Sequence, residues 1–356
     1  MDFSTVTTIK DNFIRELNEA SSGKKTSLPY IIHEMPEFSL VKDKETFQVI
    51  VIGGTFAINA HVTKKGTNCE IISQETSILP TLANREDFLI FVEQLIDDRS
   101  RVIALNFAYP IIPLFHKGKL DGKLLRGTKG HTLRGLVGKP VGEEVEKYIS
   151  GKKQRKLVVS AANDTVCLLL SGLEKTPWEK LGAGIVGSGM NFAFYTSKNT
   201  LVNLESADFD KFESSKTGKE IDKESANRGK SHYEKEVAGI YLYKHFNKML
   251  RTEKNPYASL HSTEELDTIA KTDNTKVGDT ARFLLERSAV LIAAQVAAIM
   301  EFRNTDMTFV MEGSLFWKGH EYKKTVEEYV EKLTTYKASF VGVKNSGIVG
   351  AAHLVA

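Results

Sequence analysis

The sequence predicts an α/β protein with layered sheets and helices. Strand-like runs of β-branched and aromatic residues alternate with helical patterns from residue 47 to residue 343. The helical patterns after residue 230 are longer than a small one-layer domain needs. The 356 residues, 41% of them hydrophobic, can bury enough apolar surface for two lobes.

The elements follow from local spacing. Residues 1–22 have the apolar spacing of a helix, and Gly23 with the lysines after it ends the pattern. A strand, a glycine turn and a second strand are predicted at 47–52, 53–55 and 56–62. Further strands are expected at 102–107, 157–159, 184–186, 192–195, 308–311 and 339–343. Helices are expected at 86–96, 143–149, 233–250, 281–302 and 325–333, with a solvated connection holding at most short helices at 206–231.

Composition narrows the class of partner. The chain has 48 Lys and Arg against 45 Asp and Glu, without a charge block, so neither nucleic acid nor a membrane surface is expected as a partner. Two cysteines, Cys69 and Cys167, form no disulfide framework or metal-ligand spacing, which favours a reducing, cytoplasmic location. The first residues lack the apolar core of a secretory signal. The longest apolar run, 289–300, is too short to cross a bilayer and predicts a buried helix.

Three glycine-containing segments could bring backbone N–H groups close to phosphate oxygens. A tight turn is the alternative interpretation for each of them. The segments are Gly53-Gly54-Thr55, Gly187-Ser188-Gly189 and Ser346-Gly347.

A dinucleotide fingerprint is rejected. Gly182, Gly184 and Gly187 have its spacing, but a strand-like run follows them, whereas the motif requires a helix. No Walker A pattern occurs either, so any ATP site must be built from other turns.

Several polar residues interrupt apolar segments. Asn163 and Asp164 stand between two apolar runs, where a helix cap is the alternative role. Glu205 ends an apolar run, and Glu234 opens a helix, where a carboxylate also suits the helix dipole. Lys129 lies in a glycine-containing loop, where a solvated lysine is the common case. Together, the donors and acceptors that a polyol needs are supplied by Thr128, Lys129, Asn163, Asp164, Asn191, Glu205 and Glu234.

The order of these motifs resembles the hexokinase family, sugar kinases with the actin-like ATPase fold. GTKGH is similar to the family's WTKGF, AANDTVCLLLSG to VNDTVGTL, and GIVGSGMNFAFY to the phosphate hairpin GLIxGTGxNACY. VNLESADF then resembles VNxEWGAF, SHYEKEVAGIYL resembles FEKMxSGxYLG, and MEGSLFW resembles the DGSxY segment. KNSGIVGAAHLVA resembles the closing GSGxGAA helix, so the likeness covers roughly 28–356.

The resemblance implies a two-lobed, ribonuclease H-like fold with an active-site cleft between the lobes. Residues 46–162 and 345–356 would form the small lobe, and 163–344 the large lobe. Residues 1–45 would form a helical segment packed on the large lobe.

The resemblance also implies the chemistry. The protein would use ATP to phosphorylate the 6-hydroxyl of a hexose, with glucose as the expected sugar, as in glycolysis. Asp164 matches the general base, and Lys129, if close to it, would offset negative charge as the phosphoryl group moves. Sugar contacts are matched by Thr128, Lys129, Asn163, Asp164, Asn191, Glu205 and Glu234. Mg²⁺ would be held through the ATP phosphates, without a metal site of the protein's own. Nucleotide contacts would come from Gly53, Gly54, Thr55, Gly187, Ser188, Gly189, Gly313, Ser314, Ser346 and Gly347.

Some positions depart from the family pattern. Val51, Phe56 and Ile58 replace an acid, an amide and an arginine, and the acid is expected to help hold Mg²⁺ through water. Ala108, Gly127, His131, Ser206 and Glu312 replace a serine, a tryptophan, a phenylalanine, a tryptophan and an aspartate. Two alternatives therefore stay open: a hexokinase-like sugar sensor with weak or no transfer, and a kinase for another sugar or phosphate donor. The sequence predicts no oligomeric state.

Overall fold

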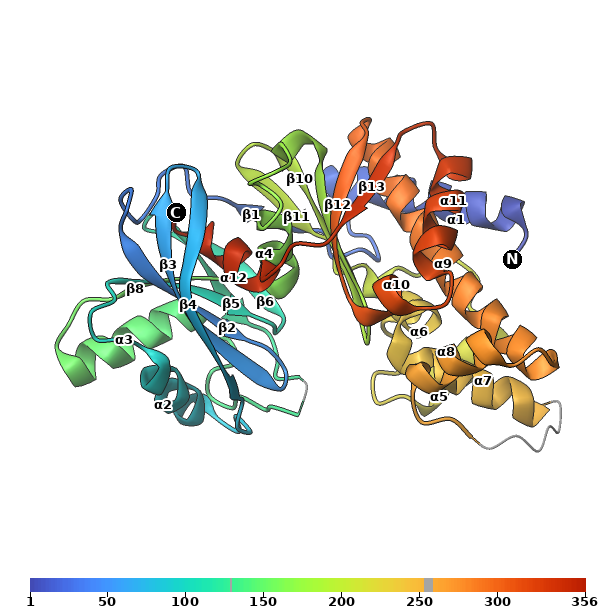
Figure 1. Ribbon diagram of the computed structural model, residues 1–356, viewed down its shortest axis with the longest axis horizontal. Coiled ribbons are helices and arrows are strands. Elements are labelled where there is room, and N and C mark those ends of the chain that lie inside the picture. The colour runs from blue at the N-terminus through green and yellow to red at the C-terminus, as the bar shows by residue number, and fades with distance from the viewer. Residues whose placement is uncertain (129, 253–258) are drawn as a thin grey trace. The chain divides into compact units, whose positions relative to one another are not determined.

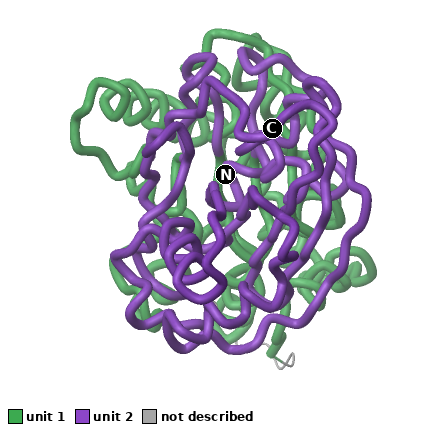
Figure 2. The backbone as a smooth tube through the Cα atoms, turned by 90° about the vertical axis from the view of Figure 1, so that its left-hand side faces the viewer, with its two compact units in different colours: residues 1–30, 184–192, 204–341 green, residues 31–183, 193–203, 342–356 purple. Residues whose placement is uncertain are grey.

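The computed structural model describes residues 1–128, 130–252 and 259–356, which form two compact units (Figure 2). Unit 1 comprises Met1–Tyr30, Gly184–Phe192 and Leu204–Val341. Unit 2 comprises Ile31–Ala183, Ala193–Asn203 and Gly342–Ala356. The lobe boundaries expected from the sequence stay a prediction.

A five-stranded sheet forms the centre of unit 2. Its order is β4-β3-β2-β5-β8, with β2 antiparallel to β3 and parallel to β5, and β5 parallel to β8. β-branched residues dominate β2, and every residue of β5 is buried, which suits central strands covered on both faces. The strands are β2 (Thr46–Ile52), β3 (Phe56–Lys65), β4 (Asn68–Ile78), β5 (Val102–Phe107) and β8 (Val158–Ala162).

The two faces of this sheet are covered by different helices. On one face, α2 (Arg85–Leu95) and α3 (Val141–Lys153) close a core that contains Ile50, Leu105 and Phe88 (Figure 1). On the other face lie α4 (Asp164–Leu170) and α12 (Ser346–Ala352). A separate antiparallel hairpin in unit 2 is formed by β6 (Ile111–His116) and β7 (Lys119–Leu124).

The helices α4 and α12 pack so closely that no side chain fits between them. A Cβ added at Gly350 would fall far inside contact distance of the Cys167 carbonyl oxygen. Only glycine permits this approach. Since α4 begins at Asp164, the contact anchors the helix that carries the predicted base.

A second, six-stranded sheet has the order β1-β11-β10-β9-β12-β13. The boundary between the units falls within β9 and β10. In unit 2, β11 is antiparallel to β1 and to β10, and in unit 1, β12 is parallel to β13. The strands are β1 (Ile31–Glu34), β9 (Leu181–Val186), β10 (Met190–Ser197), β11 (Thr200–Asn203), β12 (Met307–Glu312) and β13 (Ala338–Val341).

Unit 1 is organised around the 28-residue helix α9 (Lys276–Arg303), against which α1 (Phe3–Ser21), α8 (Thr263–Thr272) and α11 (Tyr322–Leu333) pack (Figure 1). In the described part of the chain, α9 is the one helix long and apolar enough to span a bilayer. Its most apolar window is 89% buried inside the protein, so α9 is a core helix and the predicted buried helix at 289–300 is confirmed. The remaining helices are α5 (Lys216–Glu224), α6 (His232–Val237), α7 (Gly239–Thr252), α10 (Ser314–Lys318) and the 3₁₀ turns Trp178–Lys180 and Ser206–Asp208.

The α/β prediction is confirmed, but the single helix predicted over 233–250 is wrong. The backbone is extended at Ala238, with φ −75° and ψ 145°, which separates α6 from α7. The interruption lets the Gly239 N–H donate to the Gly187 carbonyl oxygen at 2.8 Å. A Cβ at Gly239 would lie only 2.9 Å from that oxygen, so glycine is required at this contact.

Gly350→Ala is expected to lower the free energy of unfolding by about 2–3 kcal/mol, because α12 and α4 must separate to admit the methyl group. Urea unfolding measures the change. Gly151→Ala is the matched control, because Gly151 lies in α3 with open space around its Cβ position. That variant is expected to be neutral or more stable by up to about 1 kcal/mol. Equal effects of the two substitutions would contradict the close-packing argument.

Candidate active site

Three of the predicted sugar-binding residues come together in unit 1. Asn191 lies on β10, Glu205 follows β11 with a left-handed φ of 48°, and Glu234 lies in the first turn of α6. The Asn191 Nδ2 atom donates to Glu205 Oε1 at 3.1 Å. The Met190 N–H donates to Glu234 Oε1 at 3.4 Å. The adjacent residues 190 and 191 therefore contact both carboxylates.

The electrostatics of this group are set by burial. Burial raises the pKa of Glu234 to about 7, the Met190 N–H opposes the rise, and the nearby carboxylates of Glu205 and Asp208 add to it. A carboxyl group with such a pKa is able to accept a hydroxyl hydrogen when ionised and to donate when protonated. The group is thus suited to a ligand with several hydroxyls.

The predicted phosphate turn of unit 1 adjoins these carboxylates. The Gly187 N–H donates to the Gly189 carbonyl oxygen at 2.9 Å, which closes the turn between β9 and β10. A Cβ at Gly189 would lie 3.0 Å from Glu234 Oε1. Gly313, with φ 109°, lies beside Gly187: a Cβ added at Gly187 would be 3.3 Å from the Gly313 Cα atom. Ser314 then begins α10.

The other described sugar contacts of the prediction lie in unit 2: Asn163 and Asp164 directly after the parallel strand β8, and Thr128 in a loop. Asn163 caps α4 by accepting the Thr165 N–H at 2.9 Å, which confirms the cap interpretation. Asp164 Oδ1 accepts the same N–H at 2.8 Å. These two residues directly follow β8, at the strand edge where α/β proteins place their ligands.

His131 links two of the predicted segments of unit 2. Its Nδ1 atom accepts the Leu82 N–H at 3.0 Å, so its Nε2 atom carries the hydrogen and donates to the Gly54 carbonyl oxygen at 3.0 Å. Its backbone N–H donates to the Thr128 carbonyl oxygen at 2.9 Å. The sequence identified His131 only as a departure from the family, although its place three residues after Thr128 was a signal for this role.

The predicted nucleotide segments of unit 2 have the expected local structure. The Gly53 N–H donates to the Phe56 carbonyl oxygen at 3.0 Å, which makes 53–55 a strand-to-strand turn. Ser346 and Gly347 form the first turn of α12. The Asn106 Nδ2 atom donates to the Gly347 carbonyl oxygen at 3.3 Å and so joins β5 to that turn.

The two most severe departures from the family pattern are neighbours. Val51 on β2 pairs directly with Ile58 on β3, and Asn106 on β5 pairs with Val51 from the other side. An apolar pair thus stands where the family has an acid and an arginine. Over the described residues, no cluster of three His, Cys, Asp or Glu side chains could hold a metal ion. Mg²⁺ stays a prediction that depends on the ATP phosphates.

Lys129 lies outside the described residues, so its part in the site stays a prediction. The described members belong to two units: Asn191, Glu205 and Glu234 to unit 1, and Thr128, Asn163 and Asp164 to unit 2. Their common cleft likewise stays a prediction.

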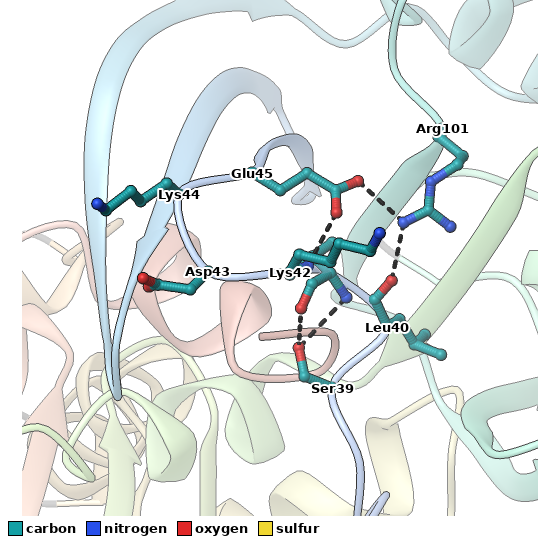
Figure 3. Close-up of a pocket in the computed structure, with 8 residues that line it drawn as sticks. Ser39, Leu40, Lys42, Asp43, Lys44, Glu45 and Arg101 are labelled. Atoms are coloured by element: carbon teal, nitrogen blue, oxygen red, sulfur yellow. Dashed lines mark hydrogen bonds and ion pairs between the residues drawn. The ribbon is translucent and has the colours of Figure 1, made fainter.

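One pocket elsewhere in unit 2 contains none of the predicted residues. It is lined by residues 39–45 and Arg101 (Figure 3). Arg101 donates to Glu45 at 2.9 Å and to the Leu40 carbonyl oxygen at 3.0 Å, and Ser39 donates to the Val41 carbonyl oxygen at 2.5 Å. These groups bond to one another, so this pocket is a feature of the loop and not a competing active site.

Comparison with known proteins agrees with the motif order. The hexokinase family model matches residues 243–356. The hexokinase of Emericella nidulans is 24% identical, with 100% of this chain and 88% of that protein covered. Hexokinase-1 of Saccharomyces cerevisiae is 25% identical over 68% of this chain, and the match spans 57% of the yeast protein. The aligned part of the chain is thus little more than half the length of that relative.

Solved structures support the fold. The Schistosoma mansoni hexokinase complexed with glucose has a TM-score of 0.77 at 20% identity, covering 100% of this chain and 95% of that one. A ROK family glucokinase from Streptomyces griseus, in complex with glucose and AMPPNP, has a TM-score of 0.57 at 13% identity, covering 87% and 99%. The chain has the two-lobed α/β fold of these sugar kinases, and its residues 243–356 match the hexokinase family model.

Proposed function

We propose that the protein transfers the terminal phosphoryl group of ATP to the 6-hydroxyl of a hexose, with glucose as the first substrate to test. The observation that carries the proposal is the neighbourhood, within unit 1, of Asn191, Glu205 and Glu234 and the Gly187–Gly189 turn. Hydroxyl-binding carboxylates beside a glycine turn suit a sugar held next to a phosphate. The names of the relatives, and the glucose bound to the Schistosoma mansoni structure, support the same substrates.

The proposed binding of the hexose uses carboxyl groups with fixed positions. Glu205 is oriented by the Asn191 amide, and Glu234 by the Met190 N–H, so both can accept hydroxyl hydrogens without rearrangement. Hydrogen bonds to ionised acceptors are the stronger kind. Pre-oriented groups of this sort reduce the entropy lost when the sugar binds.

Asp164 is the proposed general base. It would take the proton of the 6-hydroxyl as that oxygen bonds to the terminal phosphorus of ATP and the bond from this phosphorus to the ADP oxygen breaks. The anchored start of α4 holds the carboxylate, and Lys129 would offset charge on the moving group. ATP would supply the phosphoryl group, and Mg²⁺ bound to its phosphates would offset their charge.

The nucleotide phosphates are proposed to contact residues 53–55, Ser188, the Gly313–Ser314 segment and the first turn of α12. Gly313 has a φ of 109°, which favours glycine, and residues 53–55 form a tight turn. Closure of the proposed lobes over the sugar would exclude water as a competing nucleophile. A cytoplasmic location and a place in glycolysis complete the proposal.

Asp164→Asn is expected to lower kcat about a thousandfold with little change in KM for glucose, because the amide keeps the bond to Thr165 but cannot take a proton. ADP release with glucose and Mg·ATP measures it, and Asp98→Asn, a change on an exposed carboxylate, serves as control. If the wild-type protein bound glucose but released ADP no faster than Asp164→Asn, the sugar-sensor alternative would replace the kinase. A panel of hexoses and phosphate donors tests the other alternative.

Glu234→Gln is expected to change how stability depends on pH. The carboxyl pKa rises from 4.5 in the unfolded chain to about 7 in the folded protein, so folding favours the protonated form. The contribution of this carboxyl group to stability is complete below pH 4.5 and is lost as the pH rises through 7. At pH 8 the loss lowers the free energy of unfolding by roughly 3 kcal/mol.

Urea unfolding at pH 5 and pH 8 tests this. The neutral glutamine removes the dependence, so the variant should be more stable than the wild type at pH 8, by an amount that shrinks towards pH 5. Glu213→Gln, at an exposed carboxylate, should leave the wild-type difference in unfolding free energy between pH 5 and pH 8 unchanged. A Glu234→Gln protein that keeps the wild-type pH dependence would refute the raised pKa of Glu234 as its cause.

A further inference from the structure

We propose that Gln295 is a positioning residue for hexose binding, which holds Glu205 in place through Ser206 without contacting the sugar. The inference rests on the proposed function, since it assumes that Glu205 binds hydroxyls. It assigns to a residue in the middle of α9 an effect on substrate affinity.

Gln295 is out of place by composition. The segment 289–300 of α9 reads AVLIAAQVAAIM, and Gln295 is its only polar side chain. The glutamine has no exposed surface. A buried helix of this kind is normally apolar throughout, because each buried polar group loses its bonds to water.

The Gln295 amide makes one specific bond. Its Nε2 atom donates to the Ser206 Oγ atom at 2.7 Å, and Ser206 is also fully buried. The Ser206 hydroxyl in turn donates to the Met190 Sδ atom at 3.6 Å. The single hydroxyl hydrogen is thereby directed at Met190, and a lone pair of the oxygen accepts from Gln295.

The same side chain carries an unsatisfied atom. Among the described residues, the Gln295 Oε1 atom is buried and has no hydrogen-bond partner. An unpaired buried acceptor costs stability, and leucine or methionine would fill the position without that cost. A stability cost that an apolar residue would avoid is expected where a side chain serves binding.

The bond ends at the residues proposed to bind sugar. Ser206 directly follows Glu205, whose left-handed φ of 48° is strained for a residue with a side chain. Met190 directly precedes Asn191, and its own N–H donates to Glu234. One buried link from α9 therefore holds the backbone beside three predicted sugar contacts. When that link is cut, the strained backbone at Glu205 is free to relax and the carboxylate loses its place.

The test is Gln295→Leu, measured by calorimetric binding of glucose to the full chain and by the midpoint of thermal unfolding. The Kd for glucose is expected to rise about tenfold, the effect of one lost hydrogen bond. The midpoint should stay the same or rise, because the unsatisfied oxygen is removed. The affinity for ATP should not change.

Gln48→Leu is the matched control. Gln48 is another fully buried glutamine, on β2, and its side chain bonds to Asn59, the Leu95 carbonyl oxygen and the Asp97 N–H. All of these bonds are structural, so the control should lower the unfolding midpoint and leave the Kd for glucose unchanged. The two glutamines are thus expected to show opposite patterns.

Ser206→Ala cuts the same link from the other side and perturbs packing less. It should raise the Kd for glucose by a similar factor, and the double variant with Gln295→Leu should bind no more weakly than either single variant. The inference would be overturned if both single variants kept the wild-type affinity for glucose, or if Gln295→Leu lowered the unfolding midpoint without changing the Kd for glucose. Either result would leave the proposed function intact. Wild-type protein that binds no hexose would overturn both.

Discussion

The close approach of backbone segments at Gly187 is the constraint on which the site in unit 1 depends. The Gly187 carbonyl oxygen accepts the Gly239 N–H, and Gly313 lies against the other side of the same turn. Side chains at these glycines would push the segments apart. The turn therefore fixes where α7 begins, why the chain is extended before it, and how near Glu234 lies to Gly189.

The sequence predicted those elements whose signal is local. Buried strands such as β5 are mostly apolar runs, and α9 shows as a long apolar stretch. β4 was missed because its side chains are mostly exposed and polar, so the run lacks a strand's usual composition. The break at Ala238 was missed because its cause is a contact with Gly187, far away in the sequence.

The candidate site divides in the same way. Asp164 could be predicted because it interrupts apolar runs, Glu234 because it opens a helix, and both because they match a motif order. The contacts of His131 and Gln295 depend on which backbone and side-chain atoms the fold brings to them, and no local pattern in the sequence shows that. The departures from the family pattern at Val51 and Ile58 look independent in the sequence, yet the two residues are cross-strand partners.

The packing of α12 on α4 also has a consequence for the order of folding. The bond between Asn106 and Gly347 joins positions that are 241 residues apart, and most of unit 1 lies between them in the chain. Contacts that close so long a loop form late, since the entropy of the intervening chain opposes them. The helix that begins with Asp164 gains its support only when that closure is made. Unit 2 can therefore collapse early around its sheet and still lack a fixed position for the Asp164 carboxylate until the two distant segments meet.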